Sequence, residues 1–317
     1  PWRIALGEAG TFTLYCDPDR QLPETDPPSR QLTISFGCFL ELCRMAAAES
    51  GLRADVAPFP DGEPQPVLDE RPIAHVTLTP DPAIEPDPLF STVLTRRTNR
   101  VPYDTSRPVA ETDLQALRAS AVPGVDVFAS AEPARVDLLR QLAVDAWSVE
   151  WSTDRTRRES IEVMHFGKGA VNDKPFGLTV DDRFSSTMAA VGVITPESLD
   201  DPESVAYRES YANYEKACQT ATAFVWSTTR ANTRRTQLAA GASWTRTQLV
   251  ANARGLAFHP LSQALQEFPE MAQNYRRAHD LLTRDDGETV QMLARLGYAP
   301  DVDPSPRHTL ESRIIPA

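Results

Sequence analysis

The chain has 317 residues, 41% of them hydrophobic, and it carries 44 acidic against 32 basic side chains, a formal net charge of −12. This apolar fraction is enough for a sizeable core and excludes a disordered chain. The acidic total argues against duplex nucleic acid as the main partner, because that binding relies on many Lys and Arg side chains. No apolar run reaches the roughly 18 residues of a membrane-spanning helix, so we expect no membrane partner.

The chain opens on Pro1-Trp2 without an initiator Met, so we expect residues upstream, and no signal-peptide pattern is visible. The cysteines lack the paired spacing of a zinc site or a disulfide framework, which fits a reducing cytoplasm. The histidines are scattered, with no spacing typical of a metal site, so we expect no catalytic metal. The cysteines are Cys16, Cys38, Cys43 and Cys218, and the histidines are His75, His165, His259, His279 and His308.

A proline-rich segment divides the chain. Residues 79–88, TPDPAIEPDP, fit neither a helix nor a central strand, because each proline removes a backbone donor and restricts the residue before it. We interpret them as a linker between a first unit, residues 1–78, and a second unit, residues 89–317. The first unit is predicted to be α+β, with one helix and strands at residues 2–6, 12–16, 54–59 and 73–78.

Two segments of the chain resemble each other. Residues 30–52 and 234–256 each place a Gly seven residues after an Arg and a Gly-Leu pair fourteen residues after that Gly. Between the glycines, apolar residues recur at helical spacing, which predicts one apolar helix face that ends at a glycine cap. The pattern favours an internal duplication, although two Ala- and Leu-rich helices with glycine ends can also look alike by chance.

The second unit is predicted to alternate helices with strands. An irregular stretch, residues 152–200, interrupts it; glycines and prolines break its periodicity, and it is too long for a passive loop. Within it, residues 167–177, GKGAVNDKPFG, are rich enough in glycine to fold over a ligand, so we interpret the stretch as a lid insertion, the alternative being a surface excursion without a role. The predicted helices are residues 89–95, 111–119, 133–151, 204–218 and 269–282, with the repeat helix, and the predicted strands are 125–129, 223–227 and 289–296.

A basic cluster, Arg96-Arg97-Thr98-Asn99-Arg100, follows the linker. Guanidinium groups make paired, charge-assisted hydrogen bonds to phosphates and other oxyanions, which makes the cluster a candidate anion site. The alternative is a solvated helix end whose positive charges oppose the C-terminal dipole. No dinucleotide, P-loop or hydrolase-elbow motif is present to favour another chemistry.

The cluster and the Val-Pro-Tyr-Asp after it resemble the opening of the FMN-dependent nitroreductase family, whose first helix ends in an Arg-x-Ser-x-Arg/Lys run. Pro1-Trp2 resembles the end of that family's Ser-x-x-Asn-x-Gln-Pro-Trp segment. Residues 255–263, GLAFHPLSQ, resemble the stretch that passes beside the flavin ring, and Ser305-Pro306-Arg307 resembles the C-terminal phosphate clamp. With the duplication, the chain is similar to the actinobacterial Acg-like branch, in which two nitroreductase-like halves are fused.

The resemblance implies FMN as cofactor and assigns residues to it. Arg96, Thr98 and Arg307 would hold the phosphate and ribityl oxygens, and Arg100 would lie nearer N1 and O2, where the reduced ring gathers negative charge. Segment Pro260-Leu261-Ser262-Gln263 would pass the ring, with the backbone amides of Ser262 and Gln263 facing N5. His259 is expected to be a half-buried structural ring rather than a catalytic group.

The resemblance further implies two tandem nitroreductase-like α/β halves that act as a pseudo-dimeric monomer. The first half lacks a counterpart of Ser305-Pro306-Arg307, so one FMN per chain is expected. One function is an oxidoreductase that passes hydride from NAD(P)H to flavin N5 and on to a nitroaromatic, quinone or similar small-molecule acceptor, with no protein acid or base. The alternative is an FMN storage, sequestration or sensing protein with a closed lid, and a scaffold without flavin is a third.

Overall fold

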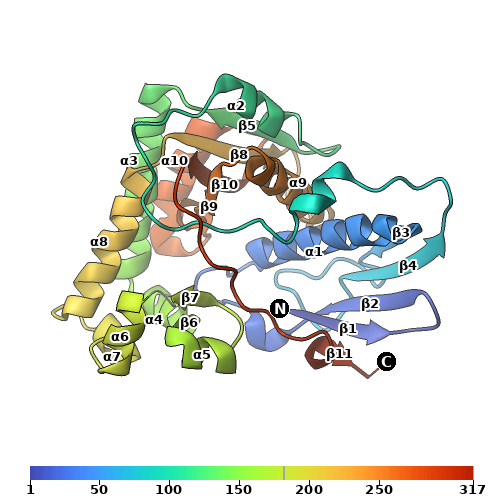
Figure 1. Cartoon of the computed structure of the whole chain (residues 1–317), viewed down its shortest axis with the longest axis horizontal. Helices are drawn as coiled ribbons and strands as arrows, with labels where there is room; N and C mark the ends of the chain where they lie inside the picture. The colour runs from blue at the N-terminus through green and yellow to red at the C-terminus, as the bar shows by residue number, and fades with distance from the viewer. Residues whose placement is uncertain (181–182, 317) are drawn as a thin grey trace.

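The computed structural model describes residues 1–180 and 183–316. The mixed α+β class expected from the sequence is confirmed, because two separate, mainly antiparallel sheets are each covered by helices (Figure 1). No helix among the described residues is long and apolar enough to cross a membrane.

The first sheet has the order β11-β1-β2-β4-β3 and is antiparallel except at β11, which runs parallel to β1. Its strands are β1 (Trp2–Leu6), β2 (Thr11–Cys16), β3 (Leu52–Pro58), β4 (Ala74–Pro80) and β11 (Ile314–Ile315). Inward-facing Leu14 and Val76 pack with Phe36 and Leu40 of helix α1 (Arg30–Glu49), so α1 covers the sheet.

The second sheet has the order β5-β8-β10-β9. Alternate residues of β8 enter different cores: Phe224 packs with α3 and α10, whereas Val225 packs with α2 and α9. This alternation is expected of a strand covered on both faces. The elements are β5 (Asp126–Ser130), β8 (Ala223–Thr229), β9 (Ala257–Pro260), β10 (Thr289–Gly297), α2 (Glu111–Arg118), α3 (Pro133–Ser152), α8 (Val205–Gln219), α9 (Arg234–Ala253) and α10 (Ala272–Leu282).

The two segments that resemble each other form the equally long helices α1 and α9, which pack against each other between the sheets (Figure 1). A Cβ at Gly37 would lie 2.0 Å from the carbonyl oxygen of Leu238, and one at Gly241 would lie 2.0 Å from that of Ile34. Only glycine permits this approach on either helix. The predicted caps, Gly51 and Gly255, both have φ of +67°.

Buried arginines at the first residue of each helix tie the two sheets together. Arg30 of α1 donates to the carbonyl oxygens of Leu265 and Gln291 in the second unit. Arg234 of α9 donates to the carbonyl oxygens of Pro64 (3.0 Å) and Pro66 (2.8 Å) in the first unit. The first arginine of each helix therefore anchors that helix to the unit that does not contain its own sheet.

The expectation that residues 152–200 are irregular is wrong. The described residues of this range form a small subdomain of short helices and a two-stranded parallel sheet: α4 (Asp154–Glu162), β6 (Met164–Phe166), α5 (Gly167–Asp173), β7 (Leu178–Val180), α6 (Arg183–Ala190) and α7 (Pro196–Asp200). Each described helix there has at most nine residues, too few to repeat an apolar pattern between the glycines and prolines.

Two further boundaries differ from the sequence expectation. The helix predicted at residues 89–95 is the 3-10 helix η2 (Pro88–Thr92), and β4 continues to Pro80, two residues into the predicted linker. Three more 3-10 helices, η3 (Gln263–Leu265), η4 (Pro269–Met271) and η5 (Glu311–Arg313), lie late in the chain. The division into 1–78 and 89–317 stays a prediction, and β11 crosses it.

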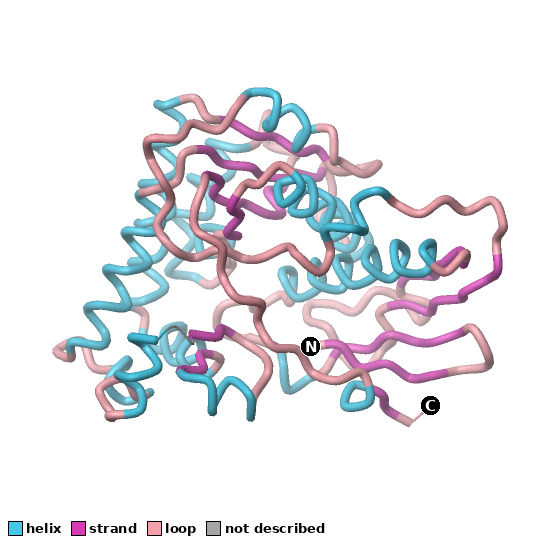
Figure 2. Tube along the Cα trace, in the orientation of Figure 1, coloured by secondary structure: helices cyan, strands magenta, loops and turns pink. Residues whose placement is uncertain are grey.

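The C-terminal tail joins the two units. After β10 it passes the insertion and reaches β1, where β11 adds the edge strand of the first sheet (Figures 1 and 2). Arg313 also donates to Asp17 of the first unit at 3.2 Å. The tail residues predicted to bind phosphate therefore lie between two fixed points.

Candidate functional site

Arg96 and Arg307, one from the basic cluster and one from the tail, lie near each other. Arg96 Nη1 donates to Gln248 Oε1 of α9 at 3.1 Å, while its Nε is buried without a hydrogen-bond partner among the described atoms. Burial, followed by the positive charge of Arg307, lowers the pKa of Arg96. The fold thus brings two like charges together and leaves a buried donor free, as expected of an anion site.

Asn99 holds the loop that carries Arg96 and Arg100. Its backbone N–H donates to Phe258 of β9 at 2.9 Å, and its side-chain amide donates to the carbonyl oxygen of Pro300 at 2.8 Å. Thr98, just before it, is half-buried. Arg97 Nη1 donates to the carbonyl oxygens of Leu94 and Arg96, which fits the solvated helix-end alternative for Arg97 itself.

Arg100 lies at the other end of this loop. The residue as a whole is exposed, but burial of its guanidinium lowers the pKa of that group, and the nearby Tyr214 of α8 opposes the shift. Arg96, Arg100 and Arg307 make no ion pair with a carboxylate in the described part of this acidic chain, whereas many of its other arginines do.

Residues Pro260 to Gln263 leave the end of β9 and are contacted from two sides. Leu261 is buried and its N–H donates to the carbonyl oxygen of Leu293 at 2.8 Å. Gln31 of α1 donates to the carbonyl oxygen of Ser262 at 3.4 Å, and the Tyr214 hydroxyl donates to Gln263 Oε1 at 2.7 Å. Tyr214 thus links this segment to Arg100, so the predicted ring-contacting residues lie in one region.

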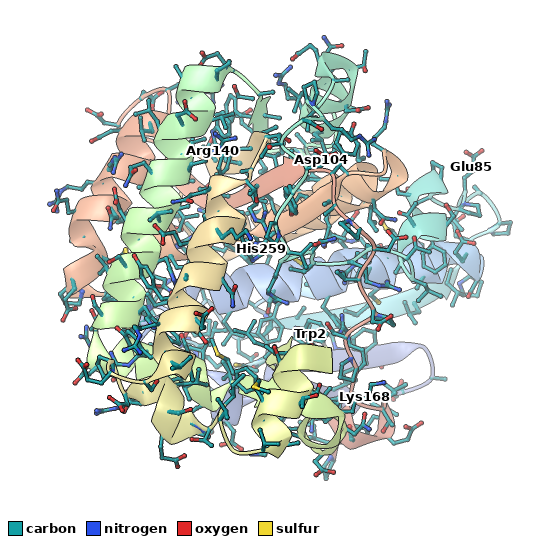
Figure 3. The ribbon with its side chains drawn as sticks, turned by 60° about the vertical axis from the view of Figure 1, so that its left-hand side comes forward. Trp2, Glu85, Asp104, Arg140, Lys168 and His259 are labelled. Atoms are coloured by element: carbon teal, nitrogen blue, oxygen red, sulfur yellow. The ribbon has the colours of Figure 1, made fainter. Side chains whose placement is uncertain are left out.

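His259 is fully buried rather than half-buried (Figure 3). Arg295 Nε donates to its Nδ1 at 2.9 Å, and burial together with the Arg295 charge places the pKa of His259 well below its usual value. A neutral, inaccessible ring agrees with a structural role. Arg295 also lies over the ring of Tyr103 at 3.8 Å; the sequence offered no signal for this buried arginine in a predicted strand.

The insertion contacts both the tail and the first unit through Phe176. The guanidinium of Arg20 lies 3.4 Å from the centre of the Phe176 ring, and His308 stacks on the ring at 5.8 Å. His165 of β6 meets the ring edge-on at 4.9 Å. Because His308 follows Arg307, this contact places the insertion beside the predicted phosphate clamp.

Trp2, the other residue of the family resemblance, packs on Phe39 of α1 with ring centres 5.1 Å apart. Its indole N–H is buried and has no partner among the described atoms. Figure 3 places Trp2 below α1, toward the insertion. It supplies a second buried donor without a described partner, besides Arg96 Nε.

The donor set suits a phosphorylated ligand with a polar ring. Arg307 Nη1 donates to the carbonyl oxygens of Ser305 and Pro306, so the remaining N–H groups of Arg307 and Arg96 are the donors available to a dianionic phosphate. Arg100 and the amides of residues 262–263 offer positive or dipolar neighbours for a ring that gains negative charge. No three His, Cys, Asp or Glu side chains are arranged to hold a metal ion in residues 1–180 and 183–316.

No protein-family model matches the chain. Among curated proteins, it is 28% identical over 99% of its length to a Mycobacterium tuberculosis protein named "Putative NAD(P)H nitroreductase", Rv3131 in strain H37Rv and MT3217 in strain CDC 1551, and covers 85% of that relative.

Solved structures are more distant. FMN-dependent nitroreductase NfnB of Mycobacterium smegmatis, in complex with NADPH, is 17% identical with a TM-score of 0.44, covering 71% of this chain and 96% of that one. A nitroreductase with bound FMN from Bacteroides fragilis is 13% identical with a TM-score of 0.39, covering 71% and 95%. The full-length curated relatives confirm the resemblance to the nitroreductase family that the sequence motifs indicated.

Proposed function

We propose that the chain is an FMN-binding, nitroreductase-like oxidoreductase of the Acg-like branch, which takes electrons from NAD(P)H and passes them to a nitroaromatic, quinone or similar small-molecule acceptor. The observation that carries the proposal is the approach of Arg307 to Arg96, whose Nε is buried without a described partner. The curated relatives, named "Putative NAD(P)H nitroreductase", support NAD(P)H as the electron donor.

In this proposal Arg96, Thr98 and Arg307 hold the phosphate and ribityl oxygens, and Arg100 lies toward N1 and O2. Residues Pro260 to Gln263 pass the ring; Gln31 holds the backbone carbonyl of Ser262, and Tyr214 holds the side chain of Gln263. FMN held by these residues would supply the hydride-accepting N5 atom and the electron transfer to the acceptor. The protein binds and orients the cofactor and the substrates, and it excludes water from them. No side chain is required as an acid or a base.

We further propose that the two units are fused halves that work as a pseudo-dimeric monomer. The reciprocal approaches of Gly37 to Leu238 and of Gly241 to Ile34 support this proposal, because two related helices then meet with equivalent contacts. The first half has no counterpart of the Arg307 tail, so one FMN per chain follows.

A second candidate, FMN storage or sensing with little turnover, is favoured by one observation. Phe176 ties the insertion to Arg20 and His308, next to Arg307, and a closed insertion there would exclude both nicotinamide and acceptor.

Steady-state NAD(P)H oxidation separates the two candidates. FMN-loaded protein is mixed with NADH or NADPH and a nitroaromatic or quinone acceptor. Turnover within the usual enzyme range of ~1–10³ per second supports the oxidoreductase. Stable FMN binding without turnover supports storage, and a chain that binds no FMN contradicts both.

A further inference from the structure

Glu150 of α3 is a buried carboxylate, 4% exposed, that the proposed cofactor contacts do not use. Its Oε1 accepts from Ser160 of α4 in the insertion at 2.8 Å, and its Oε2 accepts from the Gln266 amide at 2.8 Å. Within the described residues these partners are neutral. A buried carboxylate without a cation is costly, so its presence here calls for a physical reason.

The same carboxylate reaches the segment proposed to face the flavin ring. The Gln263 side chain lies close enough to Glu150 to lower the pKa of its carboxyl, and Gln263 Oε1 accepts from the Tyr214 hydroxyl at 2.7 Å. Trp147, one turn before Glu150 on α3, stacks on Tyr214 with ring centres 4.3 Å apart. Glu150, Gln263, Gln266 and Tyr214 therefore form one cluster, called here the Glu150 cluster.

On the basis of the proposed function, we propose that Glu150 is a positioning residue for the segment that faces the flavin ring. Its carboxylate, held by Ser160 and Gln266, orients Gln263 and places a negative charge behind the segment that faces the ring. A nearby anion disfavours the electron-rich reduced flavin, so Glu150 lowers the reduction potential of the bound cofactor. Because Ser160 belongs to the insertion, this effect depends on the position of the insertion next to α3.

The protonation of Glu150 gives the proposal a signature that packing alone does not produce. Burial raises the pKa of Glu150, while the hydrogen bonds from Ser160 and Gln266 oppose the rise. As pH falls through that pKa the charge disappears, and its effect on the flavin disappears with it. The other titratable or charged groups around the cluster are Glu159 of α4, Tyr214 and Cys218 of α8, Arg100, and Arg295 of β10.

The test is the flavin midpoint potential as a function of pH in FMN-loaded wild type, Glu150→Gln and Glu162→Gln. Glutamine matches the shape of glutamate, and Gln266 Oε1, which has no described partner, can accept its new N–H after a rotation. We expect Glu150→Gln to raise the potential at alkaline pH and to converge with wild type as pH falls. Exposed Glu162, on the following helix α4, is the matched control and should follow wild type throughout.

A third variant, Ser160→Ala, keeps the carboxylate but removes one donor to it. The pKa of Glu150 should rise, so the potential should begin to climb toward that of Glu150→Gln at a higher pH than in wild type. This variant carries the test if Glu150→Gln fails to fold.

Two results would overturn the proposal. In one, FMN binds but Glu150→Gln has the wild-type potential at every pH; in the other, Ser160→Ala leaves the pH profile unmoved. Failure of wild type and Glu162→Gln to bind FMN is a distinct result, because it removes the proposed function itself, and the role of Glu150 with it.

Discussion

Gly37 of α1 and Gly241 of α9 face each other where the two helices cross, and a Cβ on Gly241 would lie 2.8 Å from the Cα of Gly37. The same Cβ would lie 2.0 Å from the carbonyl oxygen of Ile34. Backbone atoms cannot move aside as a flexible side chain can. The glycines that revealed the repeat in the sequence are therefore the residues that permit its two copies to meet.

Replacing either glycine by alanine should separate the helices. We expect Gly37→Ala and Gly241→Ala each to lower the free energy of unfolding by about 1–3 kcal/mol or more, the usual cost of overpacking. Chemical denaturation measures this change. Gly169→Ala in α5 is the control, because its Cβ would meet nothing within 4 Å and alanine favours a helix. Equal stability of all three variants would contradict the close approach.

The phosphate assignment predicts a selective loss of affinity. Arg96→Ala and Arg307→Ala should each weaken FMN binding by roughly 1.5–3 kcal/mol, because each removes charge-assisted hydrogen bonds. FMN fluorescence titration measures the affinity, and a thermal melt without FMN shows whether folding is retained. Arg276→Ala, on an exposed position of α10, is the matched control. Unchanged affinity in both site variants would favour the alternative that the basic cluster is a solvated helix end and binds no phosphate.

The insertion is predicted to limit access to the site. Phe176→Ala removes the ring that contacts Arg20, His165 and His308, so NAD(P)H oxidation should become faster. Lys168→Ala, exposed on α5 (Figure 3), keeps these contacts and should behave as wild type.

A larger change is deletion of residues 167–177, which should increase turnover further. Flavin content is measured with each rate, because an insertion that also retains the cofactor would lose FMN when shortened. A deletion variant that keeps FMN and shows no gain in turnover would exclude the insertion as the gate.

Asp26 predicts a pH dependence of stability. Its carboxylate accepts from the N–H groups of Gln31 and Leu32 at the start of α1, and burial raises its pKa from 3.8 to about 6. A raised carboxyl pKa means that the folded state holds the proton more tightly, so this contribution is complete below pH ~4 and is lost as pH rises through ~6.

Between pH 4 and pH 7, wild type should therefore lose up to about 3 kcal/mol relative to Asp26→Asn, the equivalent of a shift of about two pKa units. Denaturant unfolding of both proteins across this range measures the difference. A difference that stays constant with pH would show that Asp26 titrates normally.

The sequence predicted the repeat helices, both sheets' main strands and the α+β class because those elements are long and regularly patterned. It did not predict the regular secondary structure of the insertion, because glycines and prolines divide that part of the chain into short helices. It also missed β11, because two residues, Ile314 and Ile315, carry no readable period.

The candidate site was predictable only in part. Arg96 and Arg307 were found because local motifs contain them. Arg295, Tyr214 and Glu150 gain their roles from partners 36, 49 and 116 residues away in the chain, and no local pattern encodes such contacts.

The proposed function requires that one FMN binds per chain between the basic cluster and the tail. Its most direct test is the flavin released by heat or acid from purified, FMN-soaked protein, measured against protein concentration. We expect about one FMN per polypeptide. Two equivalents would contradict the loss of the site in the first half, and no bound flavin would contradict the family-based assignment of the site.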